Sequence, residues 1–407
     1  METLRFLMIS SHYPPNHLGG DAVMAKYLAD ELARRGHEVH VLYDPEVYSL
    51  VRNARMTDPA PHGKGDPIIH TPTSRSGRIE ILLRLSLGWS GKMREEVNGL
   101  TKSLKIDVVH WHNTKGFIGR PFVPQERTTF YTAHDYYLVC PRSNLARPDK
   151  SFCQKPLLCQ TCLLRWRKPP QLWRVGSRRV IRLPSSIKVI CPSDFMSRRL
   201  RLDGIVVHHL QRNFVPDPAP PASEEPPTGD SITFIGMLEP HKGPRTLLEA
   251  FAISRDRQGF RLNIVGEGSL KGELSGRVKT LGLVDRVSTP GFLPSPEVET
   301  IRRNSTAVVV PSEWPENAPL AALESLALGV PVLASDAGGL PEIAGSESGS
   351  MIFKAGDVEN LADCLVTLWQ NRPRLGDMKR KAREAYVARF SPDVHIAQYL
   401  RMVNEGH

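Results

Sequence analysis

Short apolar runs alternate with helical periodicity through the first half of the chain. The run from Leu4 to Ile9 is followed by Met24, Leu28 and Leu32 at the spacing of a helix, and then by a run from Val39 to Leu42. Such runs predict buried strands, and the periodicity between them predicts an amphipathic helix. Similar runs return at Val108–Trp111, Thr129–Ala133 and Ile187–Ile190. This alternation is typical of a parallel sheet covered by helices.

A proline-rich segment interrupts the alternation. Between Pro216 and Gly229 six of fourteen residues are proline, which excludes a regular strand or helix, so we predict a linker there. Beyond it the alternation restarts, with helices predicted over Pro244–Ala252 and Pro319–Leu328. The strands predicted for this part are Ile232–Ile235, Leu262–Val265, Ala307–Val310 and Val330–Ala334. The pattern therefore predicts a second doubly wound α/β domain.

The length of the chain sets its domain organisation. At 407 residues it exceeds the size at which one core stops growing, about 250 to 300 residues. We predict two Rossmann-like domains, residues 1–212 and 213–389, with a terminal helix over about 390–407 that packs back on the first. The stretch from Asp44 to Gly77 lacks periodicity and is rich in Pro and Gly, which predicts a mobile loop. Ligands of such sheets bind beyond the carboxyl ends of the strands, so functional residues are expected there.

Two of these loops suit an anionic ligand. Gly19 and Gly20 precede a helix, where glycines let an anion approach the helix N-terminus, although a plain turn has the same pattern. The segment is not a GxGxxG fingerprint, so neither a nicotinamide nor a flavin cofactor is predicted. In the second domain Lys242 lies just before the helix that Pro244 opens. Its ammonium and the free helix N–H groups can bind one phosphate.

Two carboxylates lie close to the start of another predicted helix. Glu316 follows an apolar strand and precedes Pro319, which is suited to the first helical turn, and Glu324 comes eight residues after Glu316. The helix dipole favours a carboxylate at this end. The segment from Val308 to Val332 is otherwise nearly uncharged. This setting favours a buried or ligand-facing role over a solvated one.

The segment PSEWPENAPLAALESLALGVPVLASDAGGLPE resembles the E-x7-E signature of the retaining glycosyltransferases of family 4. YPPNHLGG, TAHD, IGMLEPHKG and IVGEG occur in that family's order, so the resemblance spans nearly the whole chain. It implies the GT-B fold, two facing Rossmann-like domains with a cleft between them. It also implies transfer of a sugar from a UDP- or GDP-sugar to a lipid-linked or glycan acceptor, with retention of anomeric configuration, in cell-surface polysaccharide or glycolipid biosynthesis.

The resemblance implies a role for each matching residue. Glu316 and His134 are the implied catalytic residues: Glu316 contacts the sugar near the reacting carbon, and His134 lies near the donor sugar. Glu324 is expected to bind the ribose hydroxyls, and Lys242 to neutralise the diphosphate. Close approach of the backbone to the donor is implied for Gly19, Gly20, Gly266, Gly338 and Gly339.

One position departs from the family's pattern. Met237 stands where most relatives carry Arg, so either the diphosphate is neutralised more weakly or His241 or Arg245 contributes. In the family's usual mechanism the leaving phosphate takes the proton of the acceptor, and a dedicated general base is unnecessary. The chain contains no Asp-x-Asp motif, in agreement with a GT-B enzyme that needs no divalent metal for catalysis.

Four of the six cysteines cluster within residues 140–162, which we interpret as an insertion in the first domain. Cys159 and Cys162 form a C-x2-C pair, and Cys140 and Cys153 lie upstream. Four thiols predict a structural zinc site, with an iron–sulfur cluster as a less favoured use of the same ligands. The alternative is four reduced thiols in a compact loop.

The net charge of +10 has a local origin. Between Leu163 and Arg201 there are eleven basic residues and one acidic residue, Asp194, while the rest of the chain is balanced. Leu163, Trp166 and Trp173 lie among them. Such a composition is typical of a segment that binds an anionic membrane surface, and equally of a solvated helix face. The few cysteines and the absence of an apolar leader favour a cytoplasmic protein, peripheral at the inner face of the membrane.

Two other kinds of function are compatible with parts of the pattern. A nucleotide-sugar epimerase or a phosphorylase shares the fold, but the two-glutamate segment and the HD strand end fit the transferases better. A basic module that binds nucleic acid or membrane is the alternative that the charge suggests. The basic stretch contains no recognisable nucleic-acid-reading motif, so no nucleic acid is expected as partner.

Overall fold

The computed structural model describes residues 3–17, 19–52, 57, 63, 65–73, 76–149, 151–154, 159–176, 180–218 and 230–405. The chain divides into two compact units. Unit 1 contains Met1–Arg212 and His395–His407, and unit 2 contains Asn213–Val394. The predicted linker lies outside the described residues from position 219 to its end at 229.

Unit 1 is built on a seven-stranded sheet in the order β3-β2-β1-β4-β5-β6-β7, and every pairing is parallel. The predicted apolar runs form its central strands, which confirms the α/β class. The order reverses between β1 and β4, so the loops that follow these two strands diverge and leave a binding crevice at their carboxyl ends. The strands are β1 Arg5–Ser10, β2 Glu38–Tyr43, β3 Ile68–His70, β4 Val108–Trp111, β5 Thr128–Thr132, β6 Ile187–Cys191 and β7 His209–Leu210.

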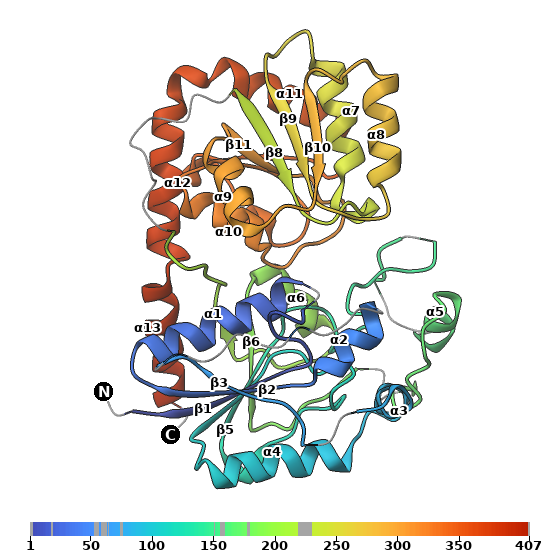
Figure 1. The fold of residues 1–407 in the computed structure, drawn as a ribbon, viewed down its shortest axis with the longest axis vertical. Helices are drawn as coiled ribbons and strands as arrows, with labels where there is room; N and C mark the ends of the chain where they lie inside the picture. Colours follow the sequence, from blue (N-terminus) through green and yellow to red (C-terminus); the bar gives the residue numbers. More distant parts are fainter. Residues whose placement is uncertain are drawn as a thin grey trace. The chain divides into compact units, whose positions relative to one another are not determined.

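Helices cover both faces of this sheet, and Figure 1 shows α1 and α4 on opposite sides of it. α1 buries Met24, Leu28 and Leu32, the residues whose spacing predicted it. The described α-helices of unit 1 are α1 Gly20–Arg34, α2 Pro45–Arg52, α3 Arg78–Leu87, α4 Gly91–Ser103, α5 Cys159–Arg165 and α6 Asp194–Leu202, together with the part of α13 (Pro392–Asn404) that begins at His395.

The stretch from Asp44 to Gly77 is more regular than predicted. It contains α2 and the edge strand β3, both too short to give a clear periodic signal. A buried ion pair joins both ends of this stretch to α3. Arg84 Nη1 donates to Asp44 Oδ2 at 2.8 Å, and Ser76 Oγ donates to the same oxygen at 2.7 Å.

The end of the chain belongs to unit 1 through Tyr399 of α13. The Tyr399 hydroxyl lies 2.9 Å from His110 Nδ1, and the two rings stack with their centroids 5.4 Å apart. Tyr399 also contacts Phe6 of β1 and Phe130 of β5, the strands on either side of β4. Gln211 Nε2 donates to the carbonyl of His395 at 2.9 Å, and this hydrogen bond holds the start of the terminal segment.

Unit 2 repeats the architecture with six parallel strands in the order β10-β9-β8-β11-β12-β13. The order reverses between β8 and β11. The strands are β8 Ser231–Ile235, β9 Arg261–Val265, β10 Val287–Gly291, β11 Ala307–Val310, β12 Val332–Ser335 and β13 Met351–Phe353. Its α-helices are α7 Pro244–Ser254, α8 Lys271–Thr280, α9 Ser295–Arg303, α10 Leu320–Ala327, α11 Val358–Gln370 and α12 Leu375–Arg389.

Figure 1 shows α7 and α8 on one face of the unit 2 sheet and α9 and α10 on the other. α7 and α10 match the two helices predicted for this part of the sequence. Within the described part of the chain, none of the helices combines the length and the apolar character needed to cross a bilayer.

Tyr399 offers a test of how the terminal segment stabilises unit 1. Tyr399→Ala removes a buried ring and is expected to lower the free energy of unfolding by about 3 to 5 kcal/mol. Tyr399→Phe leaves His110 Nδ1 without its partner and is expected to cost about 1 to 3 kcal/mol. Urea titration followed by circular dichroism measures both changes. Val387→Ala, at a half-exposed side chain of α12, is the control and is expected to change little.

Candidate functional site

The reversal of strand order in unit 2 brings a lysine and a glutamate together. Lys242 ends the 3-10 turn Pro240–Lys242 after β8, and Glu316 lies in the loop after β11. The Lys242 Nζ atom is 2.5 Å from Glu316 Oε1, and Ser312 Oγ donates to that same oxygen at 2.7 Å. Sequence analysis did not identify Ser312. It stands two residues after the apolar strand, so its position close to the strand end was the available signal.

The charge of Glu316 is maintained by this pairing. Burial alone would raise the pKa of Glu316, but the Lys242 ammonium and the hydrogen bonds from Lys242 and Ser312 outweigh it and hold that pKa below its ordinary value. Glu316 is thus ionised at neutral pH in a largely enclosed position. The site presents a cation and an anion side by side at the carboxyl edge of the sheet.

Gly338 is required where the loop of Glu316 meets the loop after β12. The two residues form a parallel bridge, and Gly339 N donates to the Glu316 carbonyl at 2.7 Å. Gly338 has φ +71°, and a Cβ there would lie 2.2 Å from the Glu316 carbonyl oxygen. Gly266 is similar, with φ +144° and a Cβ position 1.8 Å from the carbonyl oxygen of Gly236. Both glycines permit close packing of backbone at the strand ends.

Glu324 lies on α10 and is held by a cation that the sequence analysis missed. Arg302 of α9 is buried and donates through Nη2 to Glu324 Oε2 at 2.6 Å. The described residues provide no hydrogen bond to the other carboxylate oxygen. Arg302 therefore fixes the carboxylate while one oxygen stays available as an acceptor.

The structure distinguishes the basic residues considered near Met237. Met237 is exposed. Arg245 is paired with Glu273 on the surface of α7 and α8, whereas His241 is adjacent to Lys242 and close enough to Glu316 for their charges to interact. Of the two, His241 is therefore the one beside the Lys242–Glu316 pair.

In unit 1 the corresponding strand ends bring histidines together. His134 follows β5 and His112 follows β4, and His134 Nε2 lies 2.9 Å from His112 Nδ1 with the rings stacked. Burial lowers the pKa of His134 to about 4 and lowers that of His112 well below its ordinary value. Both imidazoles are therefore neutral at pH 7, and one nitrogen of the pair donates to the other.

The direction of this hydrogen bond follows from the far nitrogen of His112. His112 Nε2 is buried and has no hydrogen-bond partner among the described residues. A buried N–H without a partner is rarer and more costly than an unpaired acceptor, so the His112 proton belongs on Nδ1. His112 then donates to His134 Nε2, and the proton of His134 lies on Nδ1. His112 thereby fixes the tautomer of the predicted catalytic histidine.

The predicted glycines of unit 1 stand at the start of α1. Gly20 is the first residue of α1, and Gly19 precedes it with an extended φ of −169°. A Cβ at Gly19 would make only an ordinary contact with Asp21, so the fold itself does not require glycine there.

Asp21, the next residue of α1, is ionised in spite of its burial. Burial opposes ionisation of Asp21, but a 2.7 Å hydrogen bond from Asn113 Nδ2 is prominent among the interactions that hold its pKa below the ordinary value.

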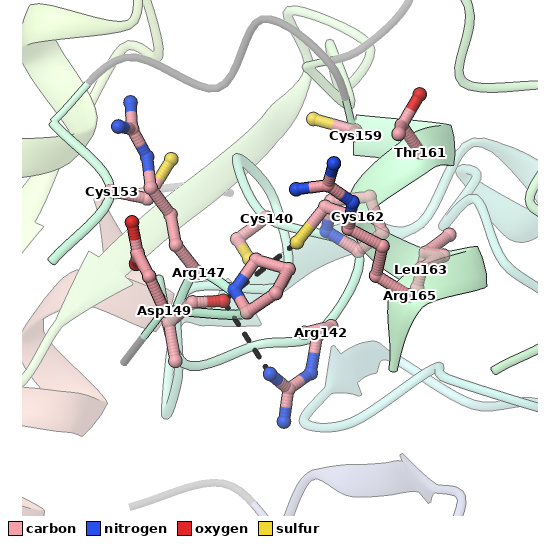
Figure 2. A pocket seen from close by; sticks show the side chains of 13 residues that line it. Cys140, Arg142, Arg147, Asp149, Cys153, Cys159, Thr161, Cys162, Leu163 and Arg165 are labelled. Carbon is pink, nitrogen blue, oxygen red and sulfur yellow. Dashed lines mark hydrogen bonds between the residues drawn. The ribbon is translucent and has the colours of Figure 1, made fainter. Parts of the chain in front are cut away.

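The four cysteines line one pocket of about 380 Å³ in unit 1. Figure 2 shows them spread around its wall, with Cys162 donating to the Ala146 carbonyl. Burial raises the pKa of Cys159 to about 11, so this thiol stays protonated at neutral pH. Among the residues that the structure describes, no three His, Cys, Asp or Glu side chains form a group able to hold a metal ion. The structure therefore does not support the predicted zinc or iron–sulfur site.

The basic stretch from residue 163 to 201 is not one surface. Arg174 is 1% exposed and donates to the carbonyls of Tyr137 and Leu138, and Arg199 is buried against Asp203. Leu163 is buried as well. Part of the charge of this stretch therefore stabilises internal backbone and a helix end instead of lying on the surface. Arg178 and Arg179 lie outside the described residues.

The contact between Gly338 and Glu316 predicts a large effect of Gly338→Ala. The variant is expected to lose about 1 to 3 kcal/mol more stability than Gly282→Ala, because its Cβ overlaps the Glu316 carbonyl. Gly282 has a similar φ of +66° with open space around it, so its alanine variant isolates the backbone strain of about 1 kcal/mol. Equal losses in the two variants, measured by urea unfolding, would contradict this account.

The Lys242–Glu316 pair predicts a pH-dependent stability difference. The folded pKa of Glu316 is lowered, so its ionised form stabilises the fold above the unfolded pKa, and this contribution is lost as pH falls through the folded pKa. In Lys242→Met, burial would instead raise the pKa of Glu316. The Tm difference from wild type is therefore expected to be largest at neutral pH and to shrink as Glu316 becomes protonated.

Lys271→Met is the matched control, since it removes an exposed lysine from a pair with Glu267 in the same unit. It is expected to change Tm little at any pH. A Tm difference for Lys242→Met that stays constant from neutral to acidic pH would show that charge on Glu316 is not its cause.

Comparison with known proteins agrees with this architecture. The family model described as Glycosyltransferase Family 4 matches residues 18–210, and the model described as Glycosyl transferases group 1 matches residues 217–385. The crystal structure of Anabaena HepE in complex with UDP superposes with a TM-score of 0.66 over 99% of this chain and 100% of that one, at 16% identity. That similarity shows the fold.

Two curated relatives match parts of the chain. The D-inositol 3-phosphate glycosyltransferase of Segniliparus rotundus is 32% identical over 40% of this chain and 37% of its own length. A putative colanic acid biosynthesis glycosyltransferase of Escherichia coli is 27% identical over 43% of this chain and 45% of its own. The chain thus matches less than half the length of either relative. From the two family models and the shared fold, the chain belongs to the group 1 glycosyltransferases, enzymes that transfer glycosyl groups, and has their GT-B fold.

Proposed function

We propose that this glycosyltransferase takes its sugar from a nucleoside diphosphate sugar and transfers it with retention of configuration. The observation that carries the proposal is the Lys242–Glu316 pair, fixed by Ser312 at the carboxyl edge where the strand order of unit 2 reverses. This is where open α/β sheets bind ligands. The UDP bound to HepE, which shares the fold, supports a UDP-sugar, and a GDP-sugar fits the same charges.

The charges of the pair match the needs of glycosyl transfer. As the glycosidic bond breaks, the leaving diphosphate gains negative charge and the sugar becomes cationic. Lys242 and the N-terminus of α7 are suited to stabilise the diphosphate, and the Glu316 carboxylate is suited to stabilise the sugar. The leaving phosphate can accept the acceptor's proton, so no further base is needed. We also propose that transfer needs no divalent cation.

The remaining site residues are assigned to binding and positioning. Glu324, with one oxygen fixed by Arg302, accepts hydrogen bonds from the ribose hydroxyls. His134 acts in transfer as a neutral hydrogen-bonding group whose tautomer His112 fixes. The backbone at Gly266, Gly338 and Gly339 offers room and amide donors for the donor, and Gly19 and Gly20 play the same part in unit 1.

For the acceptor we propose a lipid-linked or glycan hydroxyl, used at the cytoplasmic side of the cell membrane in cell-surface polysaccharide or glycolipid synthesis. The relative named for colanic acid biosynthesis supports this class. A thermal-shift screen of nucleotide sugars identifies the donor, since a ligand that binds only the folded protein raises Tm.

The donor chemistry is tested by the release of free nucleoside diphosphate from the donor found in that screen, with and without EDTA. Glu316→Gln and His134→Asn are expected to reduce turnover about a hundredfold or more, because each removes preorganised stabilisation of the transition state. Lys242→Met is expected to weaken nucleotide binding as well. Glu324→Gln is expected to act mainly on KM.

Glu273→Gln is the control for the carboxylates, because Glu273 is an exposed residue of the same unit that pairs with Arg245. It is expected to retain wild-type turnover. Full turnover in both Glu316→Gln and His134→Asn would remove the site assignment, and loss of turnover in EDTA that Mg²⁺ restores would refute metal independence.

A further inference from the structure

α3 of unit 1 presents an apolar face to solvent. Ile79, Leu83 and Leu87 are 75%, 51% and 54% exposed, and Leu82 is exposed beside them. Their positions follow helical spacing, so they lie along one stripe. Figure 1 shows α3 at the periphery of unit 1. A helix of a globular domain normally turns such a stripe toward the core.

The orientation of α3 is fixed by a buried cation on its opposite side. The Arg84 guanidinium is buried and contacts Asp44, Ser76 and Glu80. Removing this charge from its partners would leave Asp44 buried and unpaired, which is strongly unfavourable. α3 therefore cannot roll its leucines inward without breaking this network. Their exposure is a built feature of unit 1.

Neighbouring segments extend the stripe into a larger surface. Trp89 follows α3 and is 62% exposed. Leu172 is exposed, and its N–H donates to the Ser86 carbonyl at 2.9 Å, which holds it against the end of α3. The Trp173 indole donates to the Leu85 carbonyl at 3.0 Å. We call this surface the α3 face, composed of Ile79, Leu82, Leu83, Leu87, Trp89 and Leu172.

The charges around the α3 face are positive. Arg78 begins α3 and is exposed, and Arg120 is exposed above the Trp173 ring, with its Cζ 5.0 Å from the ring centroid. Gln160 of α5 bonds the backbone of Gln171 at 2.8 and 2.7 Å and so joins α5 to the Leu172 segment. The residues that end and follow α5 include the exposed Arg165, Arg167 and Lys168.

The carboxylate of α3 is already paired with other cations. Glu80 is the one acidic residue of α3, and it is engaged by Arg84 at 2.5 Å and by Lys92 at 3.6 Å. Among the described residues, none of Arg78, Arg120, Arg165, Arg167 and Lys168 has an acidic partner within 4.0 Å. The surface combines apolar side chains, an exposed indole and unpaired cations.

We propose that the α3 face docks on an anionic lipid bilayer, with its leucines and Trp89 in the headgroup boundary and the surrounding cations against lipid phosphates. A peripheral helix with leucines along one side and an indole at its end has the chemistry of an interfacial anchor. Each nearby cation adds attraction to an anionic leaflet. Glu80, the carboxylate of α3 itself, is already paired and therefore adds little repulsion from that leaflet.

Sedimentation with sucrose-loaded vesicles tests the proposal on the full chain. Vesicles of phosphatidylcholine mixed with phosphatidylglycerol are compared with phosphatidylcholine alone, at low and high salt and without any sugar donor. Wild type is expected to bind the anionic vesicles and to be released by salt. Leu82→Ser combined with Leu83→Ser is expected to lower the partition coefficient at least about tenfold, because two apolar side chains no longer enter the bilayer. Arg78→Gln with Arg167→Gln is expected to lower it about fivefold for each charge.

Leu202→Ser is the matched control, since Leu202 is an 81% exposed leucine at the end of α6 in the same unit. It is expected to bind vesicles as wild type does. The α3 variants replace exposed side chains, so their thermal melts are expected to match wild type. Unchanged vesicle binding in the leucine variant would overturn the proposal. So would loss of a concentration-dependent dimer, seen by light scattering, without a change in vesicle binding, because the α3 face would then cover a second copy. Failure of this test would leave the donor assay unaffected.

Discussion

The ion pair between Lys242 and Glu316 depends on the parallel pairing of β8 with β11. These residues are 74 positions apart, and each is delivered by the loop that leaves the carboxyl end of its strand. Because the two strands are paired, their loops start next to each other, and because the strand order reverses there, the loops then diverge around a crevice that the two side chains line. Ser312 and the backbone of Gly338 then fix the carboxylate. The sheet topology therefore determines the electrostatics of the site.

The histidines of unit 1 obey the same rule with opposite electrostatics. β4 and β5 are paired, so His112 and His134 are brought into contact at adjacent strand ends. Burial makes both rings neutral, whereas the Lys242 charge keeps Glu316 ionised in spite of burial. The difference lies in what opposes burial at each site. At Glu316 the Lys242 ammonium and two hydrogen bonds outweigh burial, whereas at His134 the attraction of Asp21 does not.

The sequence predicted the central strands and α1, α7 and α10 because each is long or strongly periodic. It missed β3, which has only three residues, and α2, which is as short as α10 but lacks its apolar character. The placement of Lys242 and Glu316 in loops after strands was predictable, but their 2.5 Å contact was not, because it depends on which strands are neighbours. The Arg302 contact to Glu324 was missed for the same reason. Counting charges also failed, because Arg174 and Arg167 look equivalent in sequence although one is buried and the other exposed.

α3 shows why an apolar stripe alone does not identify a core face. Its leucines follow the helical period, and the usual interpretation would bury them. The deciding residue is Arg84, on the other side, whose partners Asp44 and Ser76 lie 40 and 8 positions away. Turning the helix over would bury these leucines. It would also separate a buried carboxylate from its cation, at a cost of several kcal/mol. Exposure of the α3 face is therefore the lower-energy arrangement in water, and contact with a lipid surface recovers the apolar burial that the ion network prevents.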